Sequence, residues 1–183
     1  LSIGGWGGCA PCSQAFSPDE GRKIFAPSVK QLSEYFNTNG IDIDWEYPAI
    51  EGFPNHQYMP ADKSNFTALI QILRDTLSNQ YEISFAAGGF EKFLYESVDW
   101  NAIEPLVDKV NLMSYDLVNG NSTITGHHTP LYSTPEQIES ADNAIRFFDS
   151  IHFPLNKVVI GAAMYGRIFN VDVDVHNGLY QPG

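Results

Sequence analysis

Cationic side chains are scarce in this sequence, which has 10 lysines and arginines against 22 aspartates and glutamates among its 183 residues. The formal net charge is −12, which would repel a polyanion, so we expect no nucleic-acid partner. Long apolar runs are missing as well. Because a spanning helix needs roughly 18 or more apolar residues in succession, the sequence predicts no membrane span. The acidity itself is typical of a well-hydrated surface.

Cysteine occurs only at Cys9 and Cys12. One Cys-x-x-Cys pair supplies too few ligands for a four-ligand zinc site, and no histidine lies nearby in the sequence. A redox-active pair would need a helix that begins at the cysteines, and the first helix signal comes later, at Pro18. A disulfide that closes the local loop is the favoured state, with free thiols as the alternative. We expect no metal site and no cofactor.

Strand and helix patterns alternate along the whole chain. Strands are expected at residues 2–6, 41–46, 82–87, 110–115 and 158–165. This alternation predicts an α/β protein with a parallel sheet and right-handed crossovers. Such a sheet is either doubly wound or part of a (β/α)₈ barrel, and in both architectures the catalytic groups lie at the carboxyl ends of the strands. Alternation alone does not decide between the two.

Helix signals lie between these strands. Residues 17–20 form a Ser-x-x-Glu capping box, and Pro27 is expected to start a second helical piece. Residues 134–137 form another capping box, ahead of a stripe that runs from Ile138 to Phe148. The clearest amphipathic helix opens near Asp62. Its apolar stripe comprises Phe66, Leu69, Ile70, Leu73 and Leu77.

The strongest indication of function is the run 41–46, read as a strand. Ile41, Ile43 and Trp45 then share one face, and Asp42, Asp44 and Glu46 share the other. Adjacent carboxylates repel one another and can share protons, so that one stays protonated while its neighbour stays ionised. This pattern favours acid catalysis. A polar strand that faces solvent is one alternative. A hard-cation site is another, although acids along a straight strand do not easily converge on one ion.

Residues 39–46 resemble the Asp-x-x-Asp-x-Asp-x-Glu signature of glycoside hydrolase family 18, the chitinase family, with Asn39 in place of its first acid. Three further segments resemble family motifs in the same order: Ser-x-Gly-Gly at 2–5, Met-x-Tyr-Asp at 113–116 and Tyr-Gly-Arg at 165–167. The resemblance implies a partial (β/α)₈ TIM barrel. This chain would supply strands three to seven, with strands one, two and eight absent, and residues 168–183 would begin an inserted α+β subdomain.

The resemblance also implies roles for individual residues in a retaining chitinase that cleaves β-1,4-linked N-acetylglucosamine polymers. Glu46 would be the proton donor and Asp44 would orient the 2-acetamido group, whose oxygen attacks the anomeric carbon. Asp42 would support Asp44, with Ser2 as its hydrogen-bond partner, and Tyr115 would complete the catalytic set. The expected substrate-binding residues are Trp6, Tyr47, Met113, Asp116, Tyr165 and Arg167.

Other functions remain open at this point. An endo-β-N-acetylglucosaminidase acting on glycans uses the same chemistry, and a cation-dependent enzyme is a further class. A chitin-binding lectin is a third, although such family members typically replace the terminal acid, which is present here as Glu46. The expected partners are chitin or N-acetylglucosamine oligosaccharides, and the rest of a parent chain or a second copy to complete the barrel. Secretion is implied, with no signal peptide in this segment. His127 and His128 are interpreted as structural or solvent-exposed.

Overall fold

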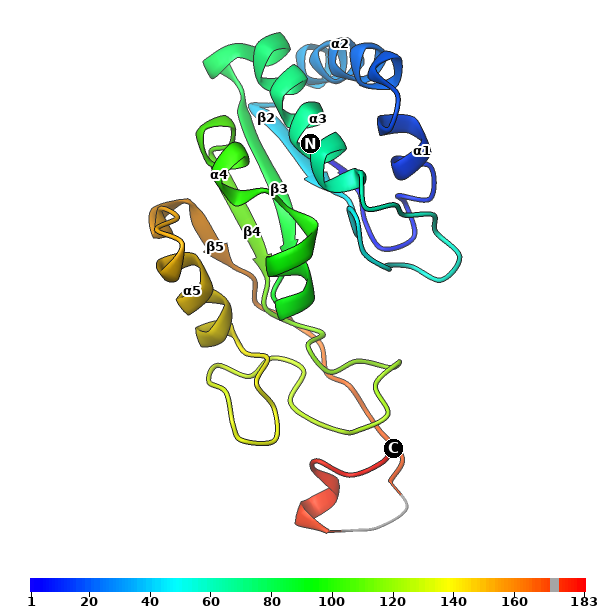
Figure 1. The fold of residues 1–183 in the computed structure, drawn as a ribbon, viewed down its shortest axis with the longest axis vertical. Coiled ribbons are helices and arrows are strands. Elements are labelled where there is room, and N and C mark those ends of the chain that lie inside the picture. Colours follow the sequence, from blue (N-terminus) through cyan, green and yellow to red (C-terminus); the bar gives the residue numbers. More distant parts are fainter. Residues whose placement is uncertain (172–174) are drawn as a thin grey trace.

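A computed structural model describes residues 1–171 and 175–183 (Figure 1). Five parallel strands form one sheet in the order β1-β2-β3-β4-β5. They are β1 (Ser2–Gly4), β2 (Gly40–Asp44), β3 (Glu82–Gly88), β4 (Lys109–Met113) and β5 (Val158–Ile160). Each strand pairs with the next one along the chain, whereas a doubly wound sheet reverses its strand order. The sheet is therefore an arc of the kind that closes into a barrel.

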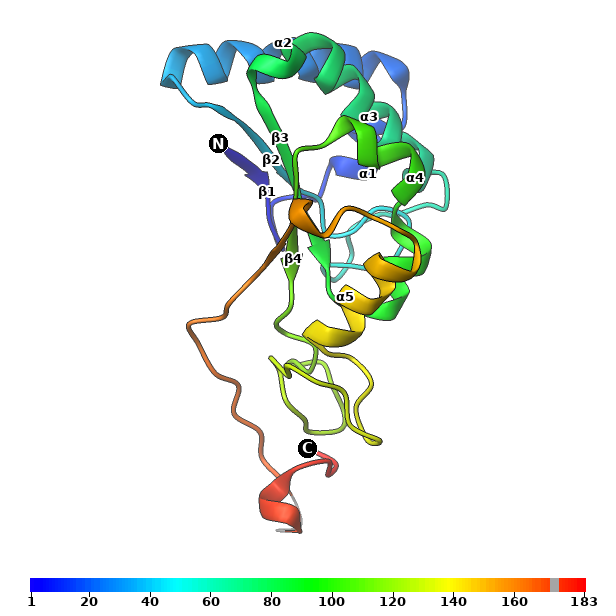
Figure 2. The ribbon, with the colours of Figure 1, turned by 90° about the vertical axis from the view of Figure 1, so that its left-hand side faces the viewer.

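The helices that connect these strands are α1 (Cys12–Phe16), α2 (Asp19–Phe36), α3 (Asp62–Leu77), α4 (Trp100–Ile103) and α5 (Ala141–Ser150). Figure 2 shows α3, α4 and α5 on the same side of the sheet. This is the arrangement of a barrel wall, with helices outside and the opposite sheet face turned inward. Among the described residues, no helix is long and apolar enough to cross a membrane.

The core lies between the sheet and these helices. The predicted alternation along β2 is confirmed, because Ile41, Ile43 and Trp45 are only 2–3% exposed. The predicted stripe of α3 is also confirmed, since all five of its residues are buried. The Phe66 ring lies 6.0 Å from the Trp45 ring and 5.2 Å from the Phe85 ring, so α3 packs against β2 and β3 through aromatic contacts. This packing fixes β2 and its carboxylates in place.

The cap and the division predicted for the helix after the first strand were wrong. A short helix, α1, already begins at Cys12, and Ser17 closes it instead of capping α2. The N-cap of α2 is Pro18, with no side-chain cap. Pro27 lies inside a continuous α2. The helix continues through it because Ala26 and Val29 on either side are fully buried, and their packing offsets the backbone hydrogen bond that proline cannot make.

Two later boundaries also differ from the prediction. Helix α5 begins at Ala141, where the Ser140 hydroxyl accepts the Asn143 N–H at 3.0 Å. The predicted cap at Thr134 closes only an isolated turn, by accepting the Gln137 N–H at 3.1 Å, and residues 135–140 are not helical. Strand β5 ends at Ile160, well short of residue 165. Within the part of the chain that the structure describes, β5 has a partner strand on one side only, so little holds the chain in the sheet.

The two outer strands of the sheet, β1 and β5, each pair with a single neighbour among the described residues. On and beyond β5, apolar side chains face solvent: Ile160 is 55% exposed, Met164 95% and Ile168 97%. Unpaired strand edges readily pair with further strands. The expectation that more polypeptide completes the barrel stays a prediction, and so does an inserted subdomain beginning at 168–183.

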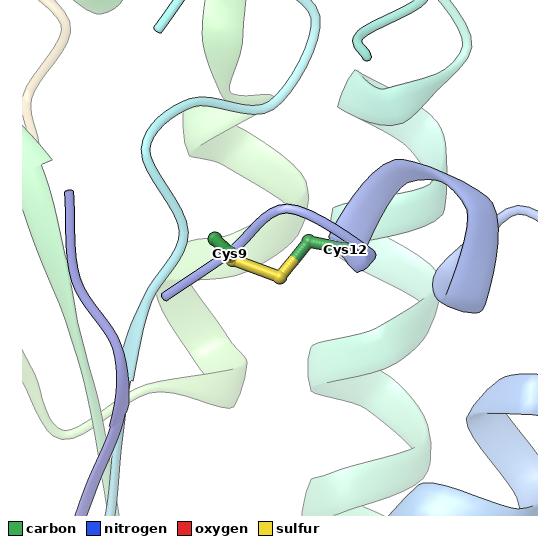
Figure 3. Close-up of a disulfide and its surroundings, with 2 residues drawn as sticks. All are labelled: Cys9 and Cys12. Atoms are coloured by element: carbon green, nitrogen blue, oxygen red, sulfur yellow. A yellow bond between two sulfur atoms is a disulfide. The ribbon is translucent and has the colours of Figure 1, made fainter. Parts of the chain in front are cut away.

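A disulfide joins Cys9 to Cys12, with the two Cα atoms 5.1 Å apart (Figure 3). It links the loop that follows β1 to the first residue of α1. Since Cys9 is buried and packs in the core, the bond anchors this loop to the helical layer.

Candidate active site

A cavity of about 750 Å³ opens at the carboxyl ends of the strands. Eight of the residues that the sequence singled out line it: Trp6, Asp44, Glu46, Tyr47, Met113, Tyr115, Asp116 and Arg167. Ser2, Asp42 and Tyr165 do not line the cavity. Ser2 donates to Asp42, which precedes Asp44 on the same face of β2, and Tyr165 donates to Asp116, which lines the cavity. The polar face of β2 and the ends of its neighbours therefore converge on one site.

Asp42 is held between three strands. Its carboxylate accepts hydrogen bonds from Ser2 Oγ at 2.8 Å, Ser84 Oγ at 2.7 Å and Asn111 Nδ2 at 2.8 Å. Ser2 and Ser84 lie directly opposite Asp42 in the register of the sheet. The bond from Ser2 is the one that the sequence predicted. The other two donors were missed, although Ser84 and Asn111 have the strand parity that faces the barrel interior.

Asp44 and Glu46 follow Asp42 along the same face. Burial, and secondly the charge of Asp42, raises the pKa of Asp44 above its ordinary value. Asp44 Oδ1 is buried and has no hydrogen-bond partner among the described residues. Glu46 is only 9% exposed, and this burial together with the charge of Asp44 raises its pKa to about 7. Glu46 thus keeps a substantial protonated fraction at neutral pH, beside a carboxylate with one unused acceptor.

Two backbone contacts join the end of β1 to the end of β2. The Gly5 N–H donates to the Asp44 carbonyl at 2.8 Å. Gly4 has a φ of +118°, and a Cβ atom there would lie 2.0 Å from the same carbonyl oxygen. Only glycine therefore allows this approach. The close approach of Gly4 to Asp44 turns the chain, and Trp6, two residues later, lines the cavity.

Aromatic rings form one wall of the cavity. The rings of Trp6 and Tyr47 lie 6.1 Å apart, and the Tyr47 ring lies 5.4 Å from that of Phe90. Trp6 is 42% exposed, which leaves part of its indole free for a ligand. Burial and the neighbouring Glu46 raise the pKa of the Tyr47 hydroxyl far above its ordinary value, so it remains a neutral phenol. Exposed aromatic surface beside carboxylates suits a sugar ring, which has apolar faces and polar edges.

Asp116 links β4 to the segment after β5. Its carboxylate accepts hydrogen bonds from Arg167 Nε at 2.7 Å and from the Tyr165 hydroxyl at 2.5 Å. Burial, and then the contact with Asp116, raises the pKa of Tyr165 to about 12, so this phenol stays a donor. His128 Nδ1 lies 3.7 Å from Asp116 Oδ1. The sequence assigned no role at the site to this histidine.

Other cavity residues were missed as well. Glu51 lies in the loop after β2, and Phe90 lies two residues after the end of β3. Glu139 lies where the sequence predicted the interior of a helix. Both of its carboxylate oxygens accept the Glu91 N–H at 3.1 Å, and burial raises its pKa. No sequence signal marked Glu139. The described residues hold no group of three His, Cys, Asp or Glu side chains that could bind a metal ion.

The chain is similar in sequence and in structure to known proteins. The family model of glycosyl hydrolases family 18 matches residues 1–181. Oviduct-specific glycoprotein from Mus musculus is 31% identical over 98% of this chain and 25% of its own length. Chitinase ChiA74 from Bacillus thuringiensis superposes with a TM-score of 0.92 at 31% identity, over 100% of this chain and 31% of that one. A family 18 N-acetylglucosaminidase from Paenibacillus barengoltzii gives a TM-score of 0.89 at 33% identity, over 100% and 56%.

The chain belongs to glycosyl hydrolase family 18. The predictions of this family and of a partial (β/α)₈ barrel are both confirmed. The chain spans between 25% and 29% of the length of the first curated relatives that it matches.

Proposed function

We propose that the protein is a chitinase, which hydrolyses β-1,4-linked N-acetylglucosamine polymers with Glu46 as the general acid. The observation that carries this proposal is the setting of Glu46: it is 9% exposed, lies at the cavity, and has a pKa of about 7. A general acid works best with a pKa near the working pH, because it must hold a proton and still release it. Asp44, the neighbour that raises this pKa, also places negative charge near the developing oxocarbenium ion.

We further propose that the substrate's own acetamido oxygen attacks the anomeric carbon, as in other substrate-assisted family 18 enzymes. Two carboxylates of the protein could compete with the acetamido oxygen as the nucleophile. Both already accept hydrogen bonds, Asp42 from three side chains and Asp116 from Tyr165 and Arg167. Asp44 Oδ1 has no such partner. It is therefore free to accept the acetamido N–H, and Tyr115, which also lines the cavity, would donate to the same group.

An extracellular location is part of the proposal. The Cys9–Cys12 disulfide supports it, since disulfides persist in oxidising environments and are rare in the cytosol. Chitin is also an extracellular polymer, so a secreted enzyme would meet its substrate.

Two alternatives rest on particular relatives. An N-acetylglucosaminidase is favoured by the Paenibacillus barengoltzii structure, at 33% identity. A protein that binds chitin without cleaving it is suggested by the oviduct-specific glycoproteins, whose name denotes no enzyme. The intact Glu46 favours catalysis over binding alone. The size of the released products separates the first alternative from a chitinase, because an N-acetylglucosaminidase releases single sugars.

The substrate prediction is tested on the natural full-length polypeptide with two oligosaccharides of equal length. N-acetylchitohexaose should be cleaved, and cellohexaose should not, because it has the same β-1,4 linkages and lacks the acetamido group. Chromatography of the products, with and without a chelator, gives the readout. Cleavage of both sugars would contradict substrate assistance, cleavage of neither would contradict the chitinase, and loss of activity with chelator would point to a cation-dependent enzyme.

A pH prediction follows from the same residue. Glu46 must be protonated to donate, and its pKa is raised to about 7. Above that pH the value of kcat/KM should fall by about tenfold for each pH unit, because the acid form is progressively lost. Values of kcat/KM measured on a soluble chitin oligosaccharide from pH 4 to 10 would show this decline on the alkaline side of the pH profile. A rate that stays constant to pH 9 would exclude Glu46 as the acid.

A further inference from the structure

His128 contacts both parts of the chain that meet at Asp116. Its backbone carbonyl accepts the Leu117 N–H at 3.1 Å, directly after Asp116. Its ring nitrogen Nε2 lies 3.0 Å from the backbone carbonyl oxygen of Tyr165. The imidazole and the Tyr165 ring are 5.3 Å apart and tilted by 36°. One side chain thus joins the loop after β4 to the segment that carries Tyr165 and Arg167.

The segment 162–168 has few other means of support. It contains no helix or strand, and Met164 and Ile168 are 95% and 97% exposed. Apart from the contact with His128, its aromatic packing comes from Tyr165, whose ring lies 6.3 Å from that of Tyr115. Among the described residues, the Tyr165 carbonyl is the one backbone group of 162–168 that makes a hydrogen bond. That bond comes from His128. The remaining polar contacts of the segment are the Tyr165 and Arg167 side chains on Asp116.

The geometry also requires a proton on one particular ring nitrogen. A carbonyl oxygen only accepts, so Nε2 must carry the proton. In the neutral ring Nδ1 is then an acceptor. It has no partner among the described residues, and Asp116 Oδ1, another acceptor, is 3.7 Å away. A ring in this form donates nothing to Asp116, whose carboxylate accepts from the Tyr165 hydroxyl and the Arg167 guanidinium.

We propose that His128 is a positioning residue, whose Nε2–H holds the Tyr165 backbone so that the Tyr165 hydroxyl and Arg167 reach Asp116 at the cavity. The effect on catalysis rests on the proposed function and on the expectation from the sequence that Asp116 and Arg167 bind the sugar. The placement of the segment itself does not depend on it. Because these groups bind substrate in the ground state and the transition state alike, losing their alignment should raise KM more than it lowers kcat.

Three variants of the natural full-length polypeptide test this. His128→Leu removes the donor, and His128→Asn has an amide too short to replace Nε2. In both we expect KM for N-acetylchitohexaose to rise roughly 3- to 10-fold, as for the loss of one hydrogen bond, with kcat little changed. In His128→Gln the amide nitrogen reaches the Nε2 position and should restore KM. His127→Leu is the matched control, because the His127 ring lies 6.0 Å from that of Tyr180, and no hydrogen bond or ion pair joins it to Asp116 among the described residues. A wild-type KM in both His128→Leu and His128→Asn would overturn the proposal.

A spectroscopic measurement decides the question independently of activity. Nitrogen-15 NMR should show His128 in the Nε2–H form at alkaline pH, and a slowly exchanging Arg167 Nε–H. That exchange should accelerate in His128→Leu and return to the wild-type rate in His128→Gln. Unchanged exchange in His128→Leu, or an Nδ1–H tautomer, would refute the positioning role. Should the wild-type protein cleave no sugar while the exchange rates behave as expected, the proposed function would fall and the role of His128 would stand.

Discussion

Glu46→Gln should lower the turnover of N-acetylchitohexaose by roughly 10²–10⁴-fold, the usual loss when a general acid is removed. Glutamine has the same shape and keeps the polar contacts, but it cannot give a proton to the leaving oxygen. Because Glu46 is buried beside Asp44, removing its carboxyl should not cost stability. Binding of the oligosaccharide should also persist, since the aromatic wall is intact. Steady-state kinetics and calorimetric binding on the natural full-length polypeptide measure both effects.

The matched control is Glu82→Gln. Glu82 opens β3 at the end of the sheet opposite the cavity, and its side chain is exposed. We expect its turnover and melting temperature to be those of the wild type. Near-normal turnover in Glu46→Gln would remove Glu46 as the acid. Equal losses in both variants would mean that the effect is structural.

The second large effect is expected for Asp44→Asn, which should lower kcat by roughly 10²–10³-fold through the loss of electrostatic stabilisation. The amide keeps an oxygen that can accept the acetamido N–H, but the negative charge is gone. That charge is the second cause of the raised pKa of Glu46, after burial. The pKa of Glu46 should therefore fall, and the alkaline limb of the residual activity should begin at a lower pH than in the wild type.

A pH profile of the Asp44→Asn variant beside Asp75→Asn, an exposed position of α3, provides the measurement and its control. The control should reproduce the wild-type limb. If Asp44→Asn retained a full rate with an unshifted limb, Asp44 would have no electrostatic role. A limb that moves to higher pH would contradict the assigned charge coupling.

The sequence predicted well what depends on local periodicity. The alternation along 41–46 placed the acids on one face and the apolar residues on the other, because a strand has a period of two whatever surrounds it. The prediction of the α3 stripe was correct because a helix likewise has a fixed period. Capping signals were less reliable, since Ser17 and Thr134 both fit a cap motif and only the packing of the neighbouring chain decides where a helix starts.

The cavity could be predicted in part. The acidic strand pattern and the family resemblance singled out Trp6, Glu46 and Asp116, and these residues lie together because strand ends converge in this fold. Glu139 and His128 come from the long loop between β4 and α5, whose path follows from tertiary contacts and not from any local pattern. The contacts of Asp42 with Ser84 and Asn111 were predictable only in part, because strand parity places all three side chains on the same face of the sheet. They follow from the strand register, which the sequence does not state.

The most direct test of the central claim is the configuration of the first product. Substrate assistance by the acetamido group, with Glu46 as the acid and Asp44 beside it, inverts the anomeric carbon twice and so retains its configuration. Proton NMR of N-acetylchitohexaose during the first minutes of hydrolysis, before mutarotation, would show which anomer forms at the new reducing end. We predict the β anomer. An initial α anomer would contradict the account, because it requires a water that attacks directly with a carboxylate as its base.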